Sequence, residues 1–223
     1  RIQQAAGLNG NRYATFHQLG KEQAQKLHED DRLYDVGDTI FIGSTPLGNS
    51  SLSLYLREYH DNALSMYPAI GNVKEGRLPE EAIEIALSED ALQYLGLDAV
   101  IGDTVSLDLS VSVMDGSLSE LEYSADFVLT GILESSYIGY ASGTVDGIVG
   151  EGTAEELLPE EYLLYSTDFK TYDKQNFQSI IYALAEDLNV DERYIQYNWV
   201  LLDAIGISYD EAADSDTGTG FSF

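Results

Sequence analysis

The chain has 223 residues, enough for one large domain or two small ones with a substantial hydrophobic core. Its 44% hydrophobic and 11% aromatic content is typical of a folded protein, and its formal net charge of −28 disfavours nucleic acid and anionic lipid surfaces as partners. The absence of cysteine excludes disulfides, thiolate metal sites and cysteine nucleophiles, but it does not define the compartment.

The two ends of the chain predict a fragment of a larger protein. No apolar run approaches the ~20 residues that a membrane-spanning helix needs. The longest apolar-rich segment, Trp199 to Ile207, is interrupted by Asp203. The chain opens on Arg1 with neither an initiator Met nor a signal peptide, so we expect further parts outside this sequence.

The first third predicts strands at 12–16, 32–43 and 52–59 and a helix at 21–29. The second of these strands is expected to break near Gly37 and Asp38. Residues 43–51 are predicted to form a loop, and a short helix capped by Asp61 follows the third strand. Residues 1–72 are therefore predicted to form the first half of an α/β core.

The middle third differs in composition, because residues 78–169 contain many acids and no Lys or Arg. A strand at 82–87 leads into a helix with Ser88 as N-cap and Gly96 as C-cap. Strands at 105–113 and 123–133 follow, and glycines spread over 135–152 predict a mobile loop or an irregular edge. Residues 73–160 are predicted to form an inserted acidic subdomain that is mixed but mainly β.

The last third repeats the strand-helix-strand order. A helical turn capped by Thr153 precedes a strand at 161–166, the clearest helix of the chain at 173–188 and a strand at 193–199. Residues 161–202 are the predicted second half of the core, and 203–223 have the composition of a linker. The predicted fold class is α+β, with a split α/β sandwich core of two strand-helix-strand units around the inserted subdomain.

Several phrases of the sequence also carry a family resemblance. GRLP at 76–79, EIALSEDALQYLG at 84–96 and IGDTVSL at 101–107 occur in this order, after RYATF at 12–16 and LGKEQ at 19–23. Together they resemble the extracytoplasmic domain, or MacB-like periplasmic core, of FtsX-like ABC-transporter permeases. The resemblance covers roughly residues 10 to 200.

This resemblance implies a non-catalytic domain at the extracellular face of the bacterial cytoplasmic membrane. Such domains bind substrates or partner proteins, or relay ATP-driven motion of the transmembrane helices. The implied partners are the rest of the permease, a cytosolic ATPase subunit that this domain does not contact, and a peptide or lipoprotein substrate or an extracellular partner. Residues 203–223 would lead into a transmembrane helix, and residues 139–152 with the acidic insert are the candidate binding edge.

No catalytic, cofactor-binding or metal-binding residue is assigned from the sequence, and no cofactor is expected. His17, His28 and His60 form no i,i+4 pair and are expected to be ordinary histidines. Ser142 stands at the wrong position for a nucleophile elbow, and the glycines of 147–152 reverse the dinucleotide-binding order. Residues 214–218 begin like a calcium loop but lack its Glu at position twelve, so a linker is expected there.

Two alternatives stay open. One is a free-standing secreted binding or adhesion module, and the other is a carbohydrate-active enzyme, because the many acids of the chain offer carboxylate pairs without singling one out. In isolation the chain is expected to be a monomer, since its net charge discourages weak self-association.

Overall fold

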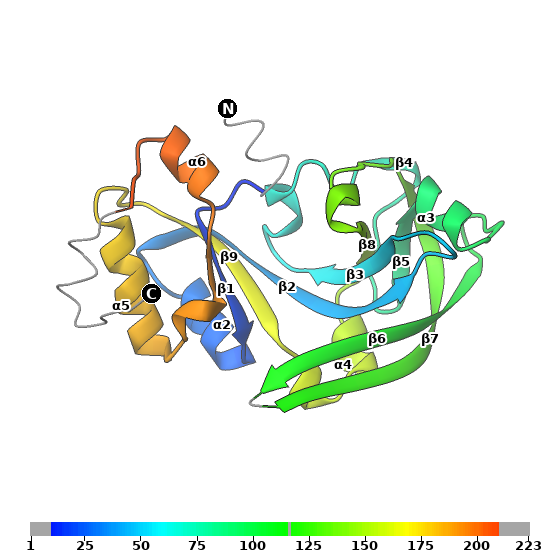
Figure 1. The fold of residues 1–223 in the computed structure, drawn as a ribbon, viewed down its shortest axis with the longest axis horizontal. Coiled ribbons are helices and arrows are strands. Elements are labelled where there is room, and N and C mark those ends of the chain that lie inside the picture. The colour runs from blue at the N-terminus through cyan, green and yellow to red at the C-terminus, as the bar shows by residue number, and fades with distance from the viewer. Residues whose placement is uncertain (1–9, 116, 210–223) are drawn as a thin grey trace.

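The structure, a computed structural model, describes residues 10–115 and 117–209, and it has an α+β fold, as the sequence predicts. The described strands belong to one mixed sheet (Figure 1). In chain order they are β1 (Ala14–Leu19), β2 (Leu33–Pro46), β3 (Ser53–Tyr59), β4 (Val73–Gly76), β5 (Glu84–Ser88), β6 (Thr104–Asp115), β7 (Ser117–Leu133), β8 (Thr144–Val149), β9 (Tyr165–Thr171) and β10 (Ile195–Tyr197). The α-helices are α2 (Lys21–His28), α3 (Glu89–Tyr94), α4 (Thr153–Leu157), α5 (Phe177–Leu188) and α6 (Trp199–Ala204). Single turns of 3₁₀ helix lie at Leu64–Met66, Tyr140–Ser142, Glu160–Tyr162 and Glu192–Tyr194.

Part of this sheet closes into a small barrel, at the right of Figure 1. The strand order is β2-β3-β8-β5-β7-β6, and β6 returns to β2 where Ser44 pairs with Ser110. Along β6, Val105, Leu107 and Leu109 are buried, while the residues between them are exposed. This alternation of period two places one face of the strand in the barrel core, and closure pairs strand edges that would otherwise be free.

The rest of the sheet is the helix-covered part, formed by β10, β1, β9 and the first half of β2. Helices α2 and α5 lie beside these strands at the left of Figure 1, and the Gln23 side chain of α2 donates a 2.8 Å hydrogen bond to the Leu188 carbonyl at the end of α5. Phe177, at the start of α5, is buried against strand and loop aromatics. Phe16 of β1 and Phe169 of β9 pack edge to face, with ring centroids 5.3 Å apart.

Strand β2 belongs to both parts of the sheet. Its residues 33–40 pair with β9, and its residues 39–46 pair with β3. The strand predicted to break near Gly37 is instead uninterrupted, and its register shifts between Tyr34 and Gly37 and again between Phe41 and Gly43. The two parts are thus joined by one continuous strand.

The first and last thirds of the chain share the helix-covered part, as a split core requires. Ala14 of β1 pairs with Phe169 of β9 on one side and with Tyr197 of β10 on the other. The second half of β2 and all of β3 lie in the barrel with strands of residues 73–160. The division at residues 72, 160 and 202 stays a prediction.

The prediction of a mobile Gly-rich loop was wrong for residues 144–149. These residues form β8, which lies between β3 and β5 and is largely buried. The glycines serve close packing: a Cβ on Gly147 would stand 2.6 Å from the Leu56 side chain, and one on Gly150 would stand 1.9 Å from the Glu81 carbonyl oxygen. Surface turns lie on both sides of β8, at Tyr140–Ser142 and at residues 151–152.

Other element boundaries also needed correction. Strand β2 extends to Pro46, into the predicted loop of residues 43–51, and β9 begins only at Tyr165, after a 3₁₀ turn. Gly152, rather than Thr153, occupies the N-cap of α4, and Trp199 begins α6 instead of ending a strand. Ser88 caps α3 as predicted by accepting a hydrogen bond from the Ala91 amide.

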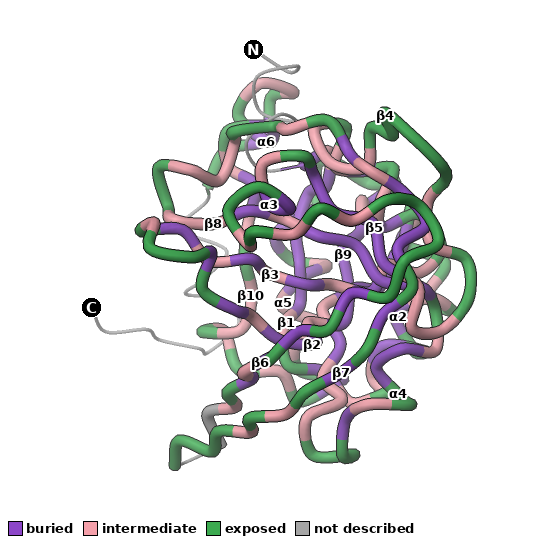
Figure 2. The backbone as a smooth tube through the Cα atoms, turned by 90° about the vertical axis from the view of Figure 1, so that its right-hand side faces the viewer, coloured by how far each residue is buried: buried purple, intermediate pink, exposed green. Residues whose placement is uncertain are grey.

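Strands of both parts are largely buried in the middle of the molecule. Figure 2 shows the buried backbone through the middle of the molecule and the exposed backbone on the outer loops and at the end of the β6–β7 hairpin. Most of the buried apolar side chains of both parts belong to one cluster, and Ala86, Leu133 and Ile148 form a second, smaller one in the barrel. The barrel and the helix-covered part therefore share a core, which holds the sheet face described next in place.

Candidate functional site

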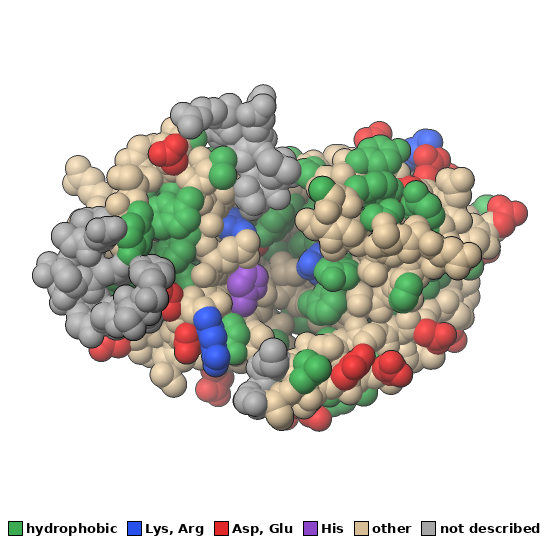
Figure 3. All heavy atoms as spheres, viewed as in Figure 1, with side chains coloured by type: hydrophobic (Ala, Val, Ile, Leu, Met, Phe, Trp, Pro, Cys, Tyr) green, Lys and Arg blue, Asp and Glu red, His purple; other side chains and the backbone are tan. Residues whose placement is uncertain are grey.

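A cleft of about 350 Å³ lies between the barrel and the helix-covered part, and we call it the polar cleft. Figure 3 shows this hollow in the middle of the molecule, with basic and histidine side chains at its walls. Its floor is one face of six neighbouring strands, β10-β1-β9-β2-β3-β8. Strand residues that line it, in that strand order, are Gln196, Thr15, His17, Ser166, Asp168, Thr39, Phe41, Arg57, Tyr59, Thr144 and Asp146.

The alternation of side chains along each strand explains why this face is polar. In β1, Thr15 and His17 line the cleft, while Phe16 between them lies in the hydrophobic core. In β9, Asp168 lines the cleft and its neighbour Phe169 lies in the core. Register then aligns the polar residues across strands, since Thr15 pairs with Asp168 on one side and with Gln196 on the other.

Asp168 is the most buried charged group of the cleft, with 2% of its surface exposed. Arg12 Nε lies 3.2 Å from its Oδ1, which also accepts a hydrogen bond from the Thr15 hydroxyl, and the Tyr67 hydroxyl donates a 2.8 Å bond to Oδ2. Burial raises the pKa of Asp168, and the positive charge of Arg12 opposes this effect. The carboxylate thus joins β1, β9 and the turn that carries Tyr67.

Arg12 itself is 4% exposed, and its Nη1 is buried without a hydrogen-bond partner. Its Nε also donates a 3.2 Å hydrogen bond to the Tyr67 hydroxyl. A buried guanidinium nitrogen without an acceptor is unfavourable unless something else satisfies it. Arg12 therefore offers a donor to an oxygen atom of a bound molecule.

A second charged pair lies on the barrel side of the cleft. Arg57 Nη1 donates a 2.6 Å hydrogen bond to Asp146 Oδ1, and its guanidinium lies 5.7 Å from the centre of the Phe41 ring. Burial raises the pKa of the neighbouring Tyr59 to about 12, so its hydroxyl stays protonated at neutral pH. The cleft therefore combines two opposite-charge pairs, tyrosine hydroxyls and an aromatic face, a lining suited to a polar molecule that carries both charges.

His17 lies in the cleft with both ring nitrogens within hydrogen-bond distance of neighbours. Its Nδ1 is 2.8 Å from the Ser166 hydroxyl, and its Nε2 is 2.9 Å from the Gln196 side-chain oxygen. These contacts link the His17 ring of β1 to β9 and to β10. The sequence singled out the residue but not its partners, which are more than a hundred positions away.

The other two histidines lie outside the cleft, beside carboxylates. His28 Nε2 is 2.9 Å from Asp38 Oδ2 and 3.8 Å from Asp61 Oδ2. His60 forms a close pair with the buried Glu58, whose other oxygen accepts a 2.8 Å hydrogen bond from the first-turn amide of Ala154 in α4. Sequence reasoning missed Asp38 and Asp61 because only the packing of α2 against β2 and the turn after β3 brings them to His28. Glu58 stands two residues before His60, so this pair was local enough to be found in the sequence.

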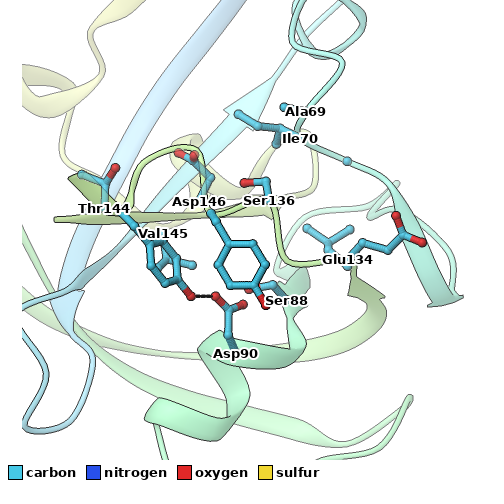
Figure 4. A pocket seen from close by; sticks show the side chains of 13 residues that line it. Ala69, Ile70, Ser88, Asp90, Glu134, Ser136, Thr144, Val145 and Asp146 are labelled. Carbon is cyan, nitrogen blue, oxygen red and sulfur yellow. Dashed lines mark hydrogen bonds between the residues drawn. The ribbon is translucent and has the colours of Figure 1, made fainter. Parts of the chain in front are cut away.

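A smaller hollow, of about 20 Å³, adjoins the polar cleft near α3 and has room for about one water molecule. Figure 4 shows Asp90 pointing from α3 toward a tyrosine hydroxyl, and this hydroxyl belongs to Tyr140. Ser135 donates a further 2.8 Å hydrogen bond to Asp90. Ala69, Ile70, Thr144 and Asp146 line both hollows, and the 3₁₀ turn before β8 contributes Tyr140 to the smaller hollow and Ser142 to the polar cleft.

Two predictions from the sequence concern the C-terminal segment and membrane-spanning helices. The calcium-like segment 214–218 and most of the predicted linker lie outside the described residues. Within residues 10–115 and 117–209, no helix has both the length and the apolar content needed to cross a bilayer.

Comparison with known proteins supports the fold. No family model and no curated protein matches the chain. Among solved structures, the periplasmic region of MacB from Actinobacillus actinomycetemcomitans superposes with a TM-score of 0.53 at 14% identity, over 94% of this chain and 99% of that one. The extracellular domain of the noncanonic ABC-type transporter YknZ from Gram-positive bacteria superposes with a TM-score of 0.51 at 12% identity, over 84% of this chain and 99% of that one. The chain therefore has the fold of extracytoplasmic domains of MacB-like ABC transporters.

Proposed function

We propose that this chain is the non-catalytic extracytoplasmic domain of an ABC-transporter permease, at the extracellular face of a bacterial cytoplasmic membrane. The observation that carries the proposal is the structural similarity to two such domains over 84% and 94% of the chain. The order of the GRLP, EIALS and IGDTVSL phrases supports it independently. The partners are then the rest of the permease and, without direct contact, its cytosolic ATPase.

The proposed role of the domain is to bind a substrate or partner in the polar cleft and to relay ATP-driven motion. The cleft supports this role because its walls belong to the barrel and to the helix-covered part, so a change in their angle changes the width of the cleft. The ligand would be a peptide, a lipoprotein or an extracellular partner. Residues 144–149 contribute to the cleft as a fixed strand, not as a mobile edge.

Location is tested with the parent protein expressed from its gene with an epitope tag. We expect the protein in the cytoplasmic-membrane fraction, with this domain cleaved by protease added outside intact cells or spheroplasts. Release of the protein into the medium would instead support a free-standing secreted module.

Motion is tested by pulsed electron spin resonance on the full transporter, and the lack of cysteine in this chain makes site-specific labelling simple. Labels at Glu122→Cys on the barrel and Glu186→Cys on α5 report the angle between the two parts, and both residues are exposed. We expect the distance distribution to shift between the nucleotide-free and ATP-bound transporter. A matched pair at Glu22→Cys and Glu186→Cys, both in the helix-covered part, should not shift.

Identical distance distributions for the barrel–helix pair in both nucleotide states would contradict the relay of motion. Binding in the cleft is tested separately through Arg57→Ala, compared with Lys74→Ala at the surface. We expect only the first change to reduce transport at equal membrane levels.

A further inference from the structure

The side chains of His28, Asp38 and Asp61 meet at one place on the surface, away from the polar cleft. They come from the last turn of α2, from β2 and from the turn after β3. One potential ligand atom of each lies within 4.8 Å of those of the other two. We propose that these three residues form a binding site for a divalent transition-metal ion, with Zn²⁺ as the probe.

The spacing of the atoms fits a small metal ion. Zinc bonds of about 2.0–2.2 Å in tetrahedral geometry place neighbouring ligand atoms about 3.4 Å apart. His28 Nε2 lies 2.9 Å from Asp38 Oδ2 and 3.8 Å from Asp61 Oδ2, so the two distances bracket this value. Small side-chain rotations therefore bring the three atoms to coordinating positions without a change in the backbone.

The state of His28 Nε2 is a second, independent observation. This nitrogen is buried and makes no hydrogen bond of acceptable geometry, although the Asp38 oxygen is close. A buried ring nitrogen usually has a hydrogen-bond partner or a metal ion. Nε2 thus faces two carboxylates at short range, as a metal ligand would.

The surroundings support Asp38 as a ligand. Its second oxygen, Oδ1, accepts a 2.7 Å hydrogen bond from the buried Thr167 hydroxyl, a contact that orients the carboxylate. The Asp38 carbonyl accepts a 2.8 Å bond from the His60 amide, and so places the turn that carries Asp61.

The ligand set selects the class of ion. One imidazole and two carboxylates suit Zn²⁺ or a similar transition metal, whereas Ca²⁺ prefers oxygen ligands only. The Asp61 side chain is 60% exposed, which leaves room for water at the fourth position. The overall charge of −28 attracts cations to the protein.

The proposal is tested by calorimetric titration of the metal-stripped 223-residue chain with Zn²⁺ and, separately, Ca²⁺. We expect one tight equivalent of Zn²⁺ and no comparable event with Ca²⁺. Asp61→Asn and His28→Gln should each weaken this Zn²⁺ binding at least tenfold. His17→Gln is the matched control, because it makes the same chemical change in the polar cleft, and it should bind like the parent.

A ring-nitrogen NMR spectrum gives a readout that does not depend on affinity. We expect the ¹⁵N signal of His28 Nε2, and not those of His17, to move on addition of one equivalent of Zn²⁺. Asp61 is exposed, so Asp61→Asn should fold even if His28→Gln does not. Absence of binding at 1 mM Zn²⁺, unchanged binding by Asp61→Asn, or an unmoved His28 signal would each overturn the proposal.

Discussion

Arg77 forms a bidentate ion pair with Glu84, with Nη1 3.0 Å from Oε1 and Nη2 2.6 Å from Oε2. The same carboxylate accepts 2.9 Å bonds from the amides of Glu80 and Glu81, so it also closes the turn between β4 and β5. The residue before Arg77 must be a glycine. A Cβ at Gly76 would stand 2.2 Å from the Thr130 carbonyl oxygen, and its backbone φ is +78°. The GRLPEE phrase therefore encodes the turn that the Arg77–Glu84 ion pair closes.

The Arg77–Glu84 ion pair predicts that the stability of the fold depends on pH. Hydrogen bonds from Arg77, and then those from the turn amides, lower the pKa of Glu84 from its ordinary 4.5 to about 2. Because the folded pKa is depressed, the stabilisation is complete above pH 4.5 and is lost as the pH falls toward 2. Glu84→Gln should remove this dependence between pH 4.5 and 2.

Urea unfolding at several pH values measures the effect. At pH 7 we expect Glu84→Gln to lose roughly 1 kcal/mol, a modest value because Arg77 is about half exposed. Glu80→Gln is the control, since its carboxylate lies 4.0 Å from Arg77 and is 75% exposed. Equal pH profiles for Glu84→Gln and the parent would contradict the assignment.

The tight approach at Gly150 predicts a large cost for a single methyl group. Gly150→Ala places its Cβ 1.9 Å from the Glu81 carbonyl oxygen, so the turn at Glu81 or strand β8 must move. We expect a loss of about 3 kcal/mol in the free energy of unfolding, as for other overpacked sites. Gly20→Ala is the control, because its new Cβ would stand 3.7 Å from the nearest atom, in the Gln23 side chain. Chemical denaturation gives both values, and similar stability for the two variants would disprove the packing argument.

The buried charge pair in the cleft predicts another strong effect. Asp168→Asn keeps the shape of the side chain but leaves the Arg12 guanidinium buried without its counter-charge. We expect a loss of about 3 kcal/mol in unfolding free energy. Ser166→Ala is the control, because Ser166 lies two residues before Asp168 in β9 and on the same cleft face. It should change the free energy of unfolding by less than about 1 kcal/mol.

The net charge predicts the state of association. With a formal charge of −28, the isolated chain should sediment as a monomer at low salt, because self-repulsion acts at long range there. Analytical ultracentrifugation at 20 mM and 500 mM NaCl measures this. A stable dimer at low salt would contradict the expectation.

Patterns that depend on neighbouring residues could be read from the sequence. Ser88 was recognised as a cap because its partner, Ala91, is three residues away. The buried face of α5 was recognised because apolar residues recur at helical spacing. These local signals predict the α+β class and most of the strands, but they miss β4 and β8 and misplace several element ends.

The polar cleft could not be read in the same way. Thr15 and Asp168 are 153 positions apart, and only the pairing of β1 with β9 brings them together. The glycines of residues 139–152 are compatible with two opposite structures, a flexible loop and a closely packed strand. Gly147 is a packing glycine because the Leu56 side chain lies against it, and Leu56 is far away in the sequence.

Strand β2 gives the molecule a mechanical property. It runs without a break through both parts of the sheet, and its two register shifts fall around Gly37 and Gly43. Any rotation of one part against the other must therefore appear as torsion in this strand, at residues that need not touch a ligand. We therefore expect changes at these bulges to alter how far the cleft opens.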